Sequence, residues 1–235
     1  MMPTQFTADI SIQDADEMAA LLGVKHYQSN IQALFEQFLT KITQDFQLTA
    51  DAAGVNTMPE NLQARIRGSV LMALSNHTGS VVLTTGNKSE TAVGYCTLYG
   101  DMAGSFAVLK DVSKTLVYQL CEYRNGISRV IPQRIIDRAP SAELRRDQTD
   151  QDSLPPYDIL DAIIEAYVEK NCTPHEIVAM GYDRAIVARV IRLIHMNEYK
   201  RRQSAPGIRI TRCDFGAGWH YPSTSSYKTW STHDL

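Results

Sequence analysis

The stretch SVVLTTGNKSE, residues 80–90, decides the fold class of this chain. Its first part, 80–84, is a short run rich in β-branched apolar residues, typical of a strand buried on both faces of a parallel sheet. Its second part, 84–90, brings hydroxyls, a glycine, an amide, a lysine and a carboxylate to the start of a helix. Because ligands of open α/β sheets bind beyond the carboxyl ends of the strands, this turn predicts a binding site.

Two interpretations of this turn stay open at the level of local pattern. In the first, the amides at the helix start favour an anion, and the Glu90 carboxylate accepts a hydrogen bond from a ribose hydroxyl or binds Mg²⁺. In the second, the turn is purely structural, and Glu90 only suits the dipole of the helix. The pattern alone therefore predicts no more than an α/β nucleotide-binding protein.

Helix signals dominate the rest of the chain. Capping boxes, in which two side chains three residues apart satisfy the first free amides of a helix, are expected at Ser11–Asp14, Thr57–Glu60 and Thr173–Glu176. Further expected elements are a helix ending at Gly23, a short strand at 26–28, a helix capped by Asn30, a loop at 48–58, a helix capped by Asp111, a polar stretch at 139–156, a helix over 157–171, and a helix from Asp183 to about Gln203. The polar stretch is expected to be either a long ordered loop or a mobile one.

Composition excludes several classes of protein. With 44% hydrophobic and 21% charged residues among 235, the chain is neither disordered nor a coiled coil. Its net charge of -3 argues against a dedicated nucleic-acid binder, and no apolar run is long enough to span a bilayer. The four widely spaced cysteines and the absence of a signal peptide predict a cytoplasmic protein with reduced thiols.

Charge is unevenly distributed along the last third of the chain. Residues 143–183 carry ten acidic and three basic side chains, whereas 184–212 carry eight basic and one acidic. The bland interpretation is two solvated helix faces. However, Lys200, Arg201 and Arg202 follow Arg189 and Arg192 on one expected helix, and clustered cations at a helix end are suited to holding phosphates of a small ligand.

Other catalytic patterns are absent. His175-Glu176 resembles the start of a zincin motif, but Ala179 stands where the second histidine is required. The sequence has no G-x-S-x-G elbow, no Walker A motif and no G-x-G-x-x-G fingerprint. No nucleophile stands out, so no catalytic residue is assigned.

Six blocks of sequence resemble the synthetase domain of glutamine-dependent NAD⁺ synthetase. They are ENLQARIRG (60–68), LTTGNKSETAVGYCTLYGDMAG (83–104), LKDVSKTLVY (109–118), PSAEL (140–144), DSLPPYDILD (152–161) and NEYKRRQSAPG (197–207). The blocks follow the order and spacing of that family up to about Tyr227. The resemblance implies an α/β fold of the ATP-pyrophosphatase type, with a parallel sheet flanked by helices.

The resemblance also implies a two-step ligase reaction. ATP adenylates the nicotinate carboxylate of deamido-NAD⁺ and releases pyrophosphate, and ammonia then displaces AMP. Mg²⁺, cationic groups and a dry site suit that chemistry. By similarity, the residues that bind deamido-NAD⁺ are Asn61, Arg65, Glu90 and Lys200, those that contact ATP are Thr85, Lys114 and Ser141, and Glu90 is also the Mg²⁺ ligand.

Some parts of the family pattern are missing. Leu98 stands where ammonia-using relatives carry a lysine, and Ser105 lies near where they carry a carboxylate, so those contacts are not transferred. The SGGxDS loop that cradles the ATP phosphates is absent, as is the glutaminase domain. We therefore expect an N-terminally truncated synthetase domain over 1–211, an irregular tail over 212–235, and little activity of this chain alone.

Two other functions compete with this one. The missing loop is also compatible with a non-catalytic nucleotide-binding remnant or an interaction subunit. Another ATP-pyrophosphatase amidotransferase, such as a GMP synthetase, fits the LTTGNKSE and NEYKRRQ blocks less well. Because truncation exposes a sheet edge and apolar surface, the chain is expected to be a homo-oligomer.

Overall fold

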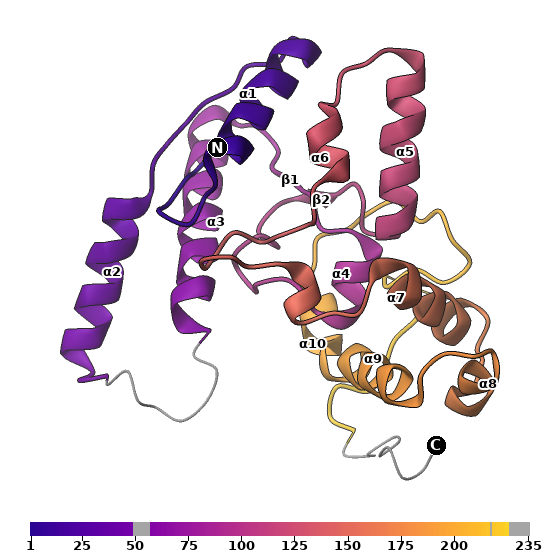
Figure 1. The fold of residues 1–235 in the computed structure, drawn as a ribbon. Helices are drawn as coiled ribbons and strands as arrows, with labels where there is room; N and C mark the ends of the chain where they lie inside the picture. Colours follow the sequence, from indigo (N-terminus) through magenta and orange to yellow (C-terminus); the bar gives the residue numbers. More distant parts are fainter. Residues whose placement is uncertain (49–56, 217, 226–235) are drawn as a thin grey trace.

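The structure, a computed structural model, describes residues 1–48, 57–216 and 218–225 (Figure 1). Its helices are α1 (Asp9–Leu22), α2 (Gln32–Asp45), α3 (Met58–Thr78), α4 (Lys88–Val93), α5 (Lys114–Ile127), α6 (Gln133–Asp137), α7 (Tyr157–Ile164), α8 (Pro174–Ala179), α9 (Arg184–Met196) and α10 (Glu198–Arg201). A 3₁₀ turn covers Asp150–Asp152, and a π-helical turn, Glu165–Glu169, continues α7. The two strands are β1 (Leu83–Thr84) and β2 (Phe106–Ala107).

The two strands pair in parallel, with Leu83 opposite Phe106 and Thr84 opposite Ala107. A parallel bridge between Ala107 and Gly207 adds a third extended segment beside β2. The predicted strand 80–84 is regular over its last two residues only. Its partner is equally short, because the Lys110 amide turns back to the Ala107 carbonyl at 3.3 Å and ends β2.

The strand predicted at 26–28 is not a regular strand. Residues 27–31 run beside the N-terminus instead, where the Ser29 amide donates to the Met1 carbonyl at 2.9 Å and the Ile31 amide donates to the Pro3 carbonyl at 3.1 Å. Pro3 has no amide hydrogen, so this ladder cannot be completed. Most of the loop predicted at 48–58 lies outside the described residues.

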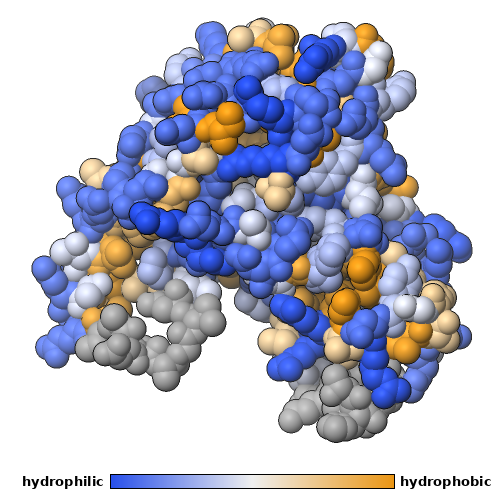
Figure 2. Space-filling view, in the orientation of Figure 1, coloured by the Kyte–Doolittle hydropathy of each residue, from blue (hydrophilic) through white to orange (hydrophobic). Residues whose placement is uncertain are grey.

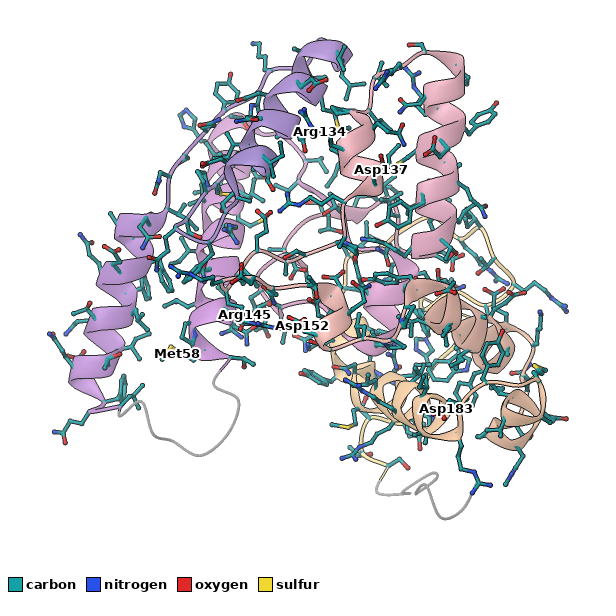
Figure 3. The ribbon with its side chains drawn as sticks, viewed as in Figure 1. Met58, Arg134, Asp137, Arg145, Asp152 and Asp183 are labelled. Atoms are coloured by element: carbon teal, nitrogen blue, oxygen red, sulfur yellow. The ribbon has the colours of Figure 1, made fainter. Side chains whose placement is uncertain are left out.

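Several predicted helix ends are confirmed. Gly23 ends α1 with a φ of 65°, and Thr173 and Glu176 form the capping box of α8. Asp183, labelled in Figure 3, caps α9 by accepting from the Ile186 amide at 2.9 Å. The capping box predicted at Thr57–Glu60 is wrong: Thr57 precedes α3, but its side chain makes no cap hydrogen bond.

Other predicted caps are wrong, because tertiary partners take the side chains. Helix α1 begins at Asp9, so Ser11 lies inside it and donates to Glu143 at 2.5 Å. Asp14 is buried and accepts from Arg134 of α6 at 2.6 Å. Asp111 does not cap α5, whose cap is Ser113. Asn30 accepts from the Gln32 amide at 2.8 Å, but Ile31 is the residue that precedes α2.

The helix predicted from Asp183 to about Gln203 is two helices, α9 and α10, separated at Asn197. The Asn197 amide group donates to the Leu193 carbonyl at 2.9 Å and to the Val93 carbonyl at 2.8 Å. The break turns α10 across the C-terminal end of α4.

Two clusters of buried side chains form the interior. The larger joins α4, α7, the π turn, α8 and α9, with Leu160, Ile163, Val190 and Ile194 at its centre. Phe215 belongs to this cluster and is 2% exposed, although it lies in the segment predicted to be an irregular tail. The smaller cluster joins the N-terminus, α2 and α3 through Ile31, Phe35, Leu62 and Ile66. Among the described residues, no helix has the length and apolar character needed to cross a membrane.

Candidate functional site

The turn 84–90 links β1 to α4 as the sequence predicts. Asn87 and Glu90 form a capping box, in which the Glu90 amide donates to the Asn87 side chain at 2.9 Å and the Asn87 amide donates to the Glu90 carboxylate at 3.1 Å. The Lys88 amide donates to the Val112 carbonyl at 2.8 Å. These three amides are therefore already used by acceptors of the protein, which favours the structural interpretation of this turn.

Glu90 and Lys114 form an ion pair at the edge of this turn. The Lys114 ammonium lies 3.1 Å from the Glu90 carboxylate, and both side chains are largely buried. Burial alone lowers the pKa of Lys114, but the charge and hydrogen bond of Glu90 outweigh it and raise the pKa. The ammonium also lies 5.3 Å from the centre of the Tyr157 ring. The structure thus brings together two predicted ligand contacts.

A small cleft opens between the turn, the loop 94–105 and α10. It is lined by Thr84, Gly86, Glu90, Thr91, Cys96, Asp101, Met102, Ala107, Lys110, Lys200, Arg201, Ser204 and Ala205. The cleft places Glu90 and Lys200, two predicted dinucleotide contacts, on one surface. Thr85 is exposed, between the two cleft residues Thr84 and Gly86.

Three polar cleft residues were not found by sequence reasoning. Burial raises the pKa of the Asp101 carboxyl above its usual value and lowers that of Lys110. Burial also raises the pKa of Cys96 to about 12, so its thiol stays protonated at neutral pH. Asp101 lies in the block GYCTLYGD, and only its place in that block marked it in the sequence.

The basic cluster around Lys200 is used differently from the prediction. Lys200 donates to the carbonyls of Gly94 and Cys96 at 2.8 and 2.7 Å. Arg201 is buried, pairs with Glu198 at 3.0 Å and donates to the Ala92 carbonyl at 2.6 Å. Arg202 pairs with the same Glu198. Most of this charge therefore stabilises the C-terminal end of α4, and of these three cations Lys200 is the one least committed to carboxylates.

Asn61 and Arg65 lie on one face of α3, as their spacing predicts, and both hold the loop 94–105. The Thr97 hydroxyl donates to the Asn61 side chain at 2.8 Å, and the Arg65 guanidinium donates to the Leu98 carbonyl at 3.2 Å. Neither residue lines the cleft. They support the loop that supplies Cys96 and Asp101.

Ser141 does not line the cleft either; its hydroxyl accepts from the Glu143 amide at 3.1 Å. The surrounding loop is ordered by ion pairs. Glu143 pairs with Arg138 at 2.9 Å, and Arg145 pairs with Asp152 at 2.5 Å (Figure 3). The stretch 139–156 forms a long loop that contains one 3₁₀ turn, Asp150–Asp152.

A second, larger cavity of about 410 Å³ lies on the other side of α4. It is lined by Lys88, Ser89, Asp111, Ser113, Thr115, Leu116, Asp158, Asp161, Ala162, Ile164, Glu165, Glu169 and Thr211. Lys88 and Ser89 therefore face one cavity while Glu90 and Thr91 face the other. Helix α4 is the wall between them.

The cleft offers Mg²⁺ two carboxylates, those of Glu90 and Asp101, and burial raises the pKa of Asp101, which leaves Glu90 as the better ligand. No group of three or more possible metal ligands occurs in the described ranges 1–48, 57–216 and 218–225. Mg²⁺ is often held by one or two carboxylates together with substrate phosphates and waters. Glu90 fits that mode, provided that Lys114 releases one of its carboxylate oxygens.

Comparison with known proteins agrees with the sequence blocks. The NAD synthase family model matches residues 1–204. Glutamine-dependent NAD(+) synthetase of Acinetobacter baylyi is 52% identical over 230 residues, covering 97% of this chain and 42% of the relative. The chain thus spans about two fifths of the length of this curated relative.

Solved structures of two synthetases match most of this chain. A glutamine-dependent NAD⁺ synthetase from Acinetobacter baumannii in complex with ADP is 47% identical, with a TM-score of 0.56, and the match covers 95% of this chain and 39% of that one. An NMN synthetase from Francisella tularensis is 26% identical, with a TM-score of 0.70 and coverage of 86% and 74%. The predicted α/β fold of the ATP-pyrophosphatase type, covering a fraction of the longer relatives, is confirmed, and the chain belongs to the NAD synthase family.

Proposed function

We propose that this chain carries the amide-forming part of a glutamine-dependent NAD⁺ synthetase, a ligase. The substrates are ATP, deamido-NAD⁺ and ammonia. The carboxylate of deamido-NAD⁺ is adenylated with loss of pyrophosphate, and ammonia replaces AMP to give the amide of NAD⁺. The observation that carries the proposal is the pair Glu90–Lys114 at the rim of a cleft that also holds Lys200.

In this proposal Lys114 changes partner when ligand binds. Its ammonium now lies 3.1 Å from Glu90, and a triphosphate offers it more negative charge than one carboxylate does. Once Lys114 turns to the phosphates, the Glu90 oxygen becomes available to Mg²⁺, which supplies charge neutralisation during pyrophosphate release. Thr85 and Ser141 are proposed as the other ATP contacts.

Deamido-NAD⁺ is proposed to lie along the cleft toward Lys200. Lys200 has two of its three hydrogens on the Gly94 and Cys96 carbonyls, which leaves one donor for an acceptor on the dinucleotide. Asn61 and Arg65 contact the same loop from α3, and we propose that they complete this binding surface. Ammonia comes from glutamine hydrolysis by a domain outside this chain.

We infer that the chain acts in the cytoplasm and forms a homo-oligomer. Support for self-association comes from apolar side chains at the surface. Phe38 and Phe46 beside α2 are 55% and 71% exposed, and Figure 2 shows apolar atoms at the surface in the region of α2 and α3. On α5, Leu120 and Ile127 are 46% and 66% exposed, and the helix has no buried residue.

The test is calorimetric titration of the 235-residue chain with Mg-ATP and with deamido-NAD⁺, followed by an assay of ammonia-dependent pyrophosphate release. We expect binding of both ligands and little or no turnover, because the loop that positions the ATP phosphates in the family is absent. The full-length Acinetobacter baylyi relative serves as the positive control for turnover.

The alternative is a nucleotide-binding remnant or interaction subunit that takes no part in the reaction. It predicts that ATP binds but deamido-NAD⁺ does not. If neither ligand binds at millimolar concentration, the proposed function is wrong. A rise in melting temperature with xanthylate but not with deamido-NAD⁺ would instead favour the hypothesis that the chain belongs to a GMP synthetase.

A further inference from the structure

The segment 205–216, which we call the strap, lies beyond the part of the chain matched by the family model, which ends at residue 204. It is nevertheless bound to the folded domain along its length. The Ala107 amide donates to the Pro206 carbonyl at 2.8 Å, and Gly207 bridges to β2. Near its end, Phe215 is 2% exposed within the larger core cluster.

The strap meets α4 at Lys88. The Lys88 ammonium is almost fully buried and lies 2.6 Å from the Thr211 hydroxyl and 3.0 Å from the Cys213 carbonyl. Two carboxylates complete its surroundings, Asp111 at 2.8 Å and Glu169 at 2.7 Å. Every direction in which Lys88 can donate is therefore taken, so it is not available to a ligand.

Asp111 ties the same strap from the other side. Its carboxylate accepts from the amides of Ile210 and Thr211, both at 2.7 Å, and from the Thr211 hydroxyl at 2.8 Å. Burial raises the pKa of Asp111, but the bonds from Lys88 and the strap outweigh it and hold the pKa below its usual value. Thr211 thus contacts both members of a buried ion pair.

The first turn of α4 is fixed from a second direction by Ser89. Its hydroxyl donates to Asp161 of α7 and accepts from the Lys114 amide at 2.8 Å. Lys88 and Ser89 point away from the cleft, and Glu90 follows them directly on the cleft side. The position of Glu90 relative to Lys114 is therefore set by how firmly Lys88 and Ser89 are held.

We propose that the strap is a positioning element of the nucleotide site, acting through Lys88. Neither Lys88 nor Thr211 touches substrate in this proposal; both hold the first turn of α4 so that Glu90 keeps its place. The choice of ligand rests on the proposed function. The claim that the strap holds the first turn of α4 does not depend on any ligand.

The test uses Thr211→Val, which removes the shared hydroxyl and keeps the shape of the side chain. Removing Lys88 itself is avoided, because that leaves the Asp111 carboxylate buried without its cation. The matched control is Thr173→Val, which removes the cap hydroxyl of α8, a helix that lines neither the cleft nor the larger cavity. Each change removes hydrogen bonds of one threonine hydroxyl, so both variants are expected to melt at lower temperature than the parent.

The first readout is hydrogen exchange of the backbone amides of α4, which needs no ligand. We expect exchange at residues 88–93 to accelerate about tenfold in Thr211→Val, as the loss of one bond to a charged group predicts. Thr173→Val should leave these amides unchanged, and Thr211→Ser should restore the parent rates. Equal exchange at α4 in the parent and Thr211→Val overturns the proposal.

The second readout is the affinity for Mg-ATP, measured well below every melting temperature. We expect binding to weaken about tenfold in Thr211→Val and not in Thr173→Val. If exchange at α4 accelerates while affinity is unchanged, the strap stabilises α4 without positioning the site, and the proposal is wrong. If the parent chain itself binds no ATP, the proposed function fails, while the exchange experiment still decides whether the strap holds α4.

Discussion

The Lys114 ammonium donates to the Glu90 carboxylate across 3.1 Å, joining the start of α5 to the start of α4. The two residues are 24 positions apart, yet each is also the residue that similarity assigns to a ligand. The two side chains proposed to contact ligand therefore hold each other in this structure. In the proposed function, ligand binding exchanges this ion pair for new partners.

Glu90→Gln is expected to weaken both Mg-ATP binding and the fold. Glutamine still completes a capping box, but the largely buried Lys114 ammonium loses its carboxylate, so the cost to stability should be about 1–3 kcal/mol. Binding should fall on the order of tenfold, because the charge that suits Mg²⁺ is lost. Calorimetry with and without Mg²⁺ measures this change.

Glu176→Gln is the matched control for that measurement. Glu176 fills the same position in the capping box of α8, and its cap bonds to Thr173 are the cause of its lowered pKa. This variant should bind Mg-ATP as the parent does. Equal affinities for the two variants would show that Glu90 has only a capping role.

Gly94→Ala is expected to destabilise the chain more than Gly79→Ala does. Both glycines end a helix with a φ of 70°, a conformation that costs about 1–2 kcal/mol with a side chain. A methyl group at Gly79 meets nothing within 4 Å, whereas at Gly94 it would lie 2.1 Å from the Asn197 side chain. The extra cost at Gly94 should be about 1–3 kcal/mol.

Urea unfolding of the two glycine variants measures the difference. Gly94→Ala must displace the Asn197 side chain from the Val93 carbonyl. This hydrogen bond, which we call the clamp, holds the C-terminal end of α4 and should be lost as well. If the two variants lose the same free energy of unfolding, Asn197 moves aside without cost and the clamp contributes little.

His195 is expected to make the chain less stable in mild acid. Burial lowers its pKa to about 4, whereas an unfolded histidine titrates near 6.5. Between these values the unfolded chain binds the extra proton, so the free energy of unfolding falls as the pH drops. Between pH 7 and pH 5 this single group should cost about 2 kcal/mol.

His195→Gln should remove that part of the pH dependence. Its neighbours are the Tyr167 hydroxyl at 2.7 Å, the Tyr221 ring, stacked with ring centroids 3.8 Å apart, and Arg201, whose positive charge also lowers the pKa of His195. The control is His175→Gln, at an exposed position. The free energy of unfolding is measured at pH 7, 6 and 5. If it falls with pH as steeply in His195→Gln as in the parent, the assignment of this pH dependence to His195 is wrong.

Self-association is expected to depend on α2. The paired change Phe38→Glu and Phe46→Glu removes exposed apolar surface, so it should leave the free energy of unfolding within about 1 kcal/mol of the parent value. It should also convert the oligomer into a 26.3 kDa monomer in sedimentation velocity. The paired change Leu120→Glu and Ile127→Glu removes the exposed apolar side chains of α5 and shows whether that helix contributes to the same association. A parent chain that sediments as a monomer would refute the expectation.

The sequence by itself determined the local structure around the site. The strand-to-helix turn 84–90, the glycine end of α1 at Gly23 and the capping box at Thr173 were all predictable, because their partners lie within four residues. The family blocks added the fold class, and with it the residues expected to bind ligand. The Asn87–Glu90 capping box satisfies amides that were expected to be free, so even local patterns needed the structure to assign their use.

Only the tertiary structure decided which charges face the cleft and which stabilise the fold. Arg201 and Lys200 were equivalent members of a basic cluster, yet Arg201 is buried against Glu198 and Lys200 reaches the loop 94–105. Asp111 has the sequence context of a helix cap but binds Lys88 and the strap. Apart from Arg201–Glu198, which is an i,i+3 pair, these pairings join residues about 20 to 110 positions apart, where sequence spacing carries no information about distance. They form because a buried charge must find a partner, and the folded chain determines which partner is near.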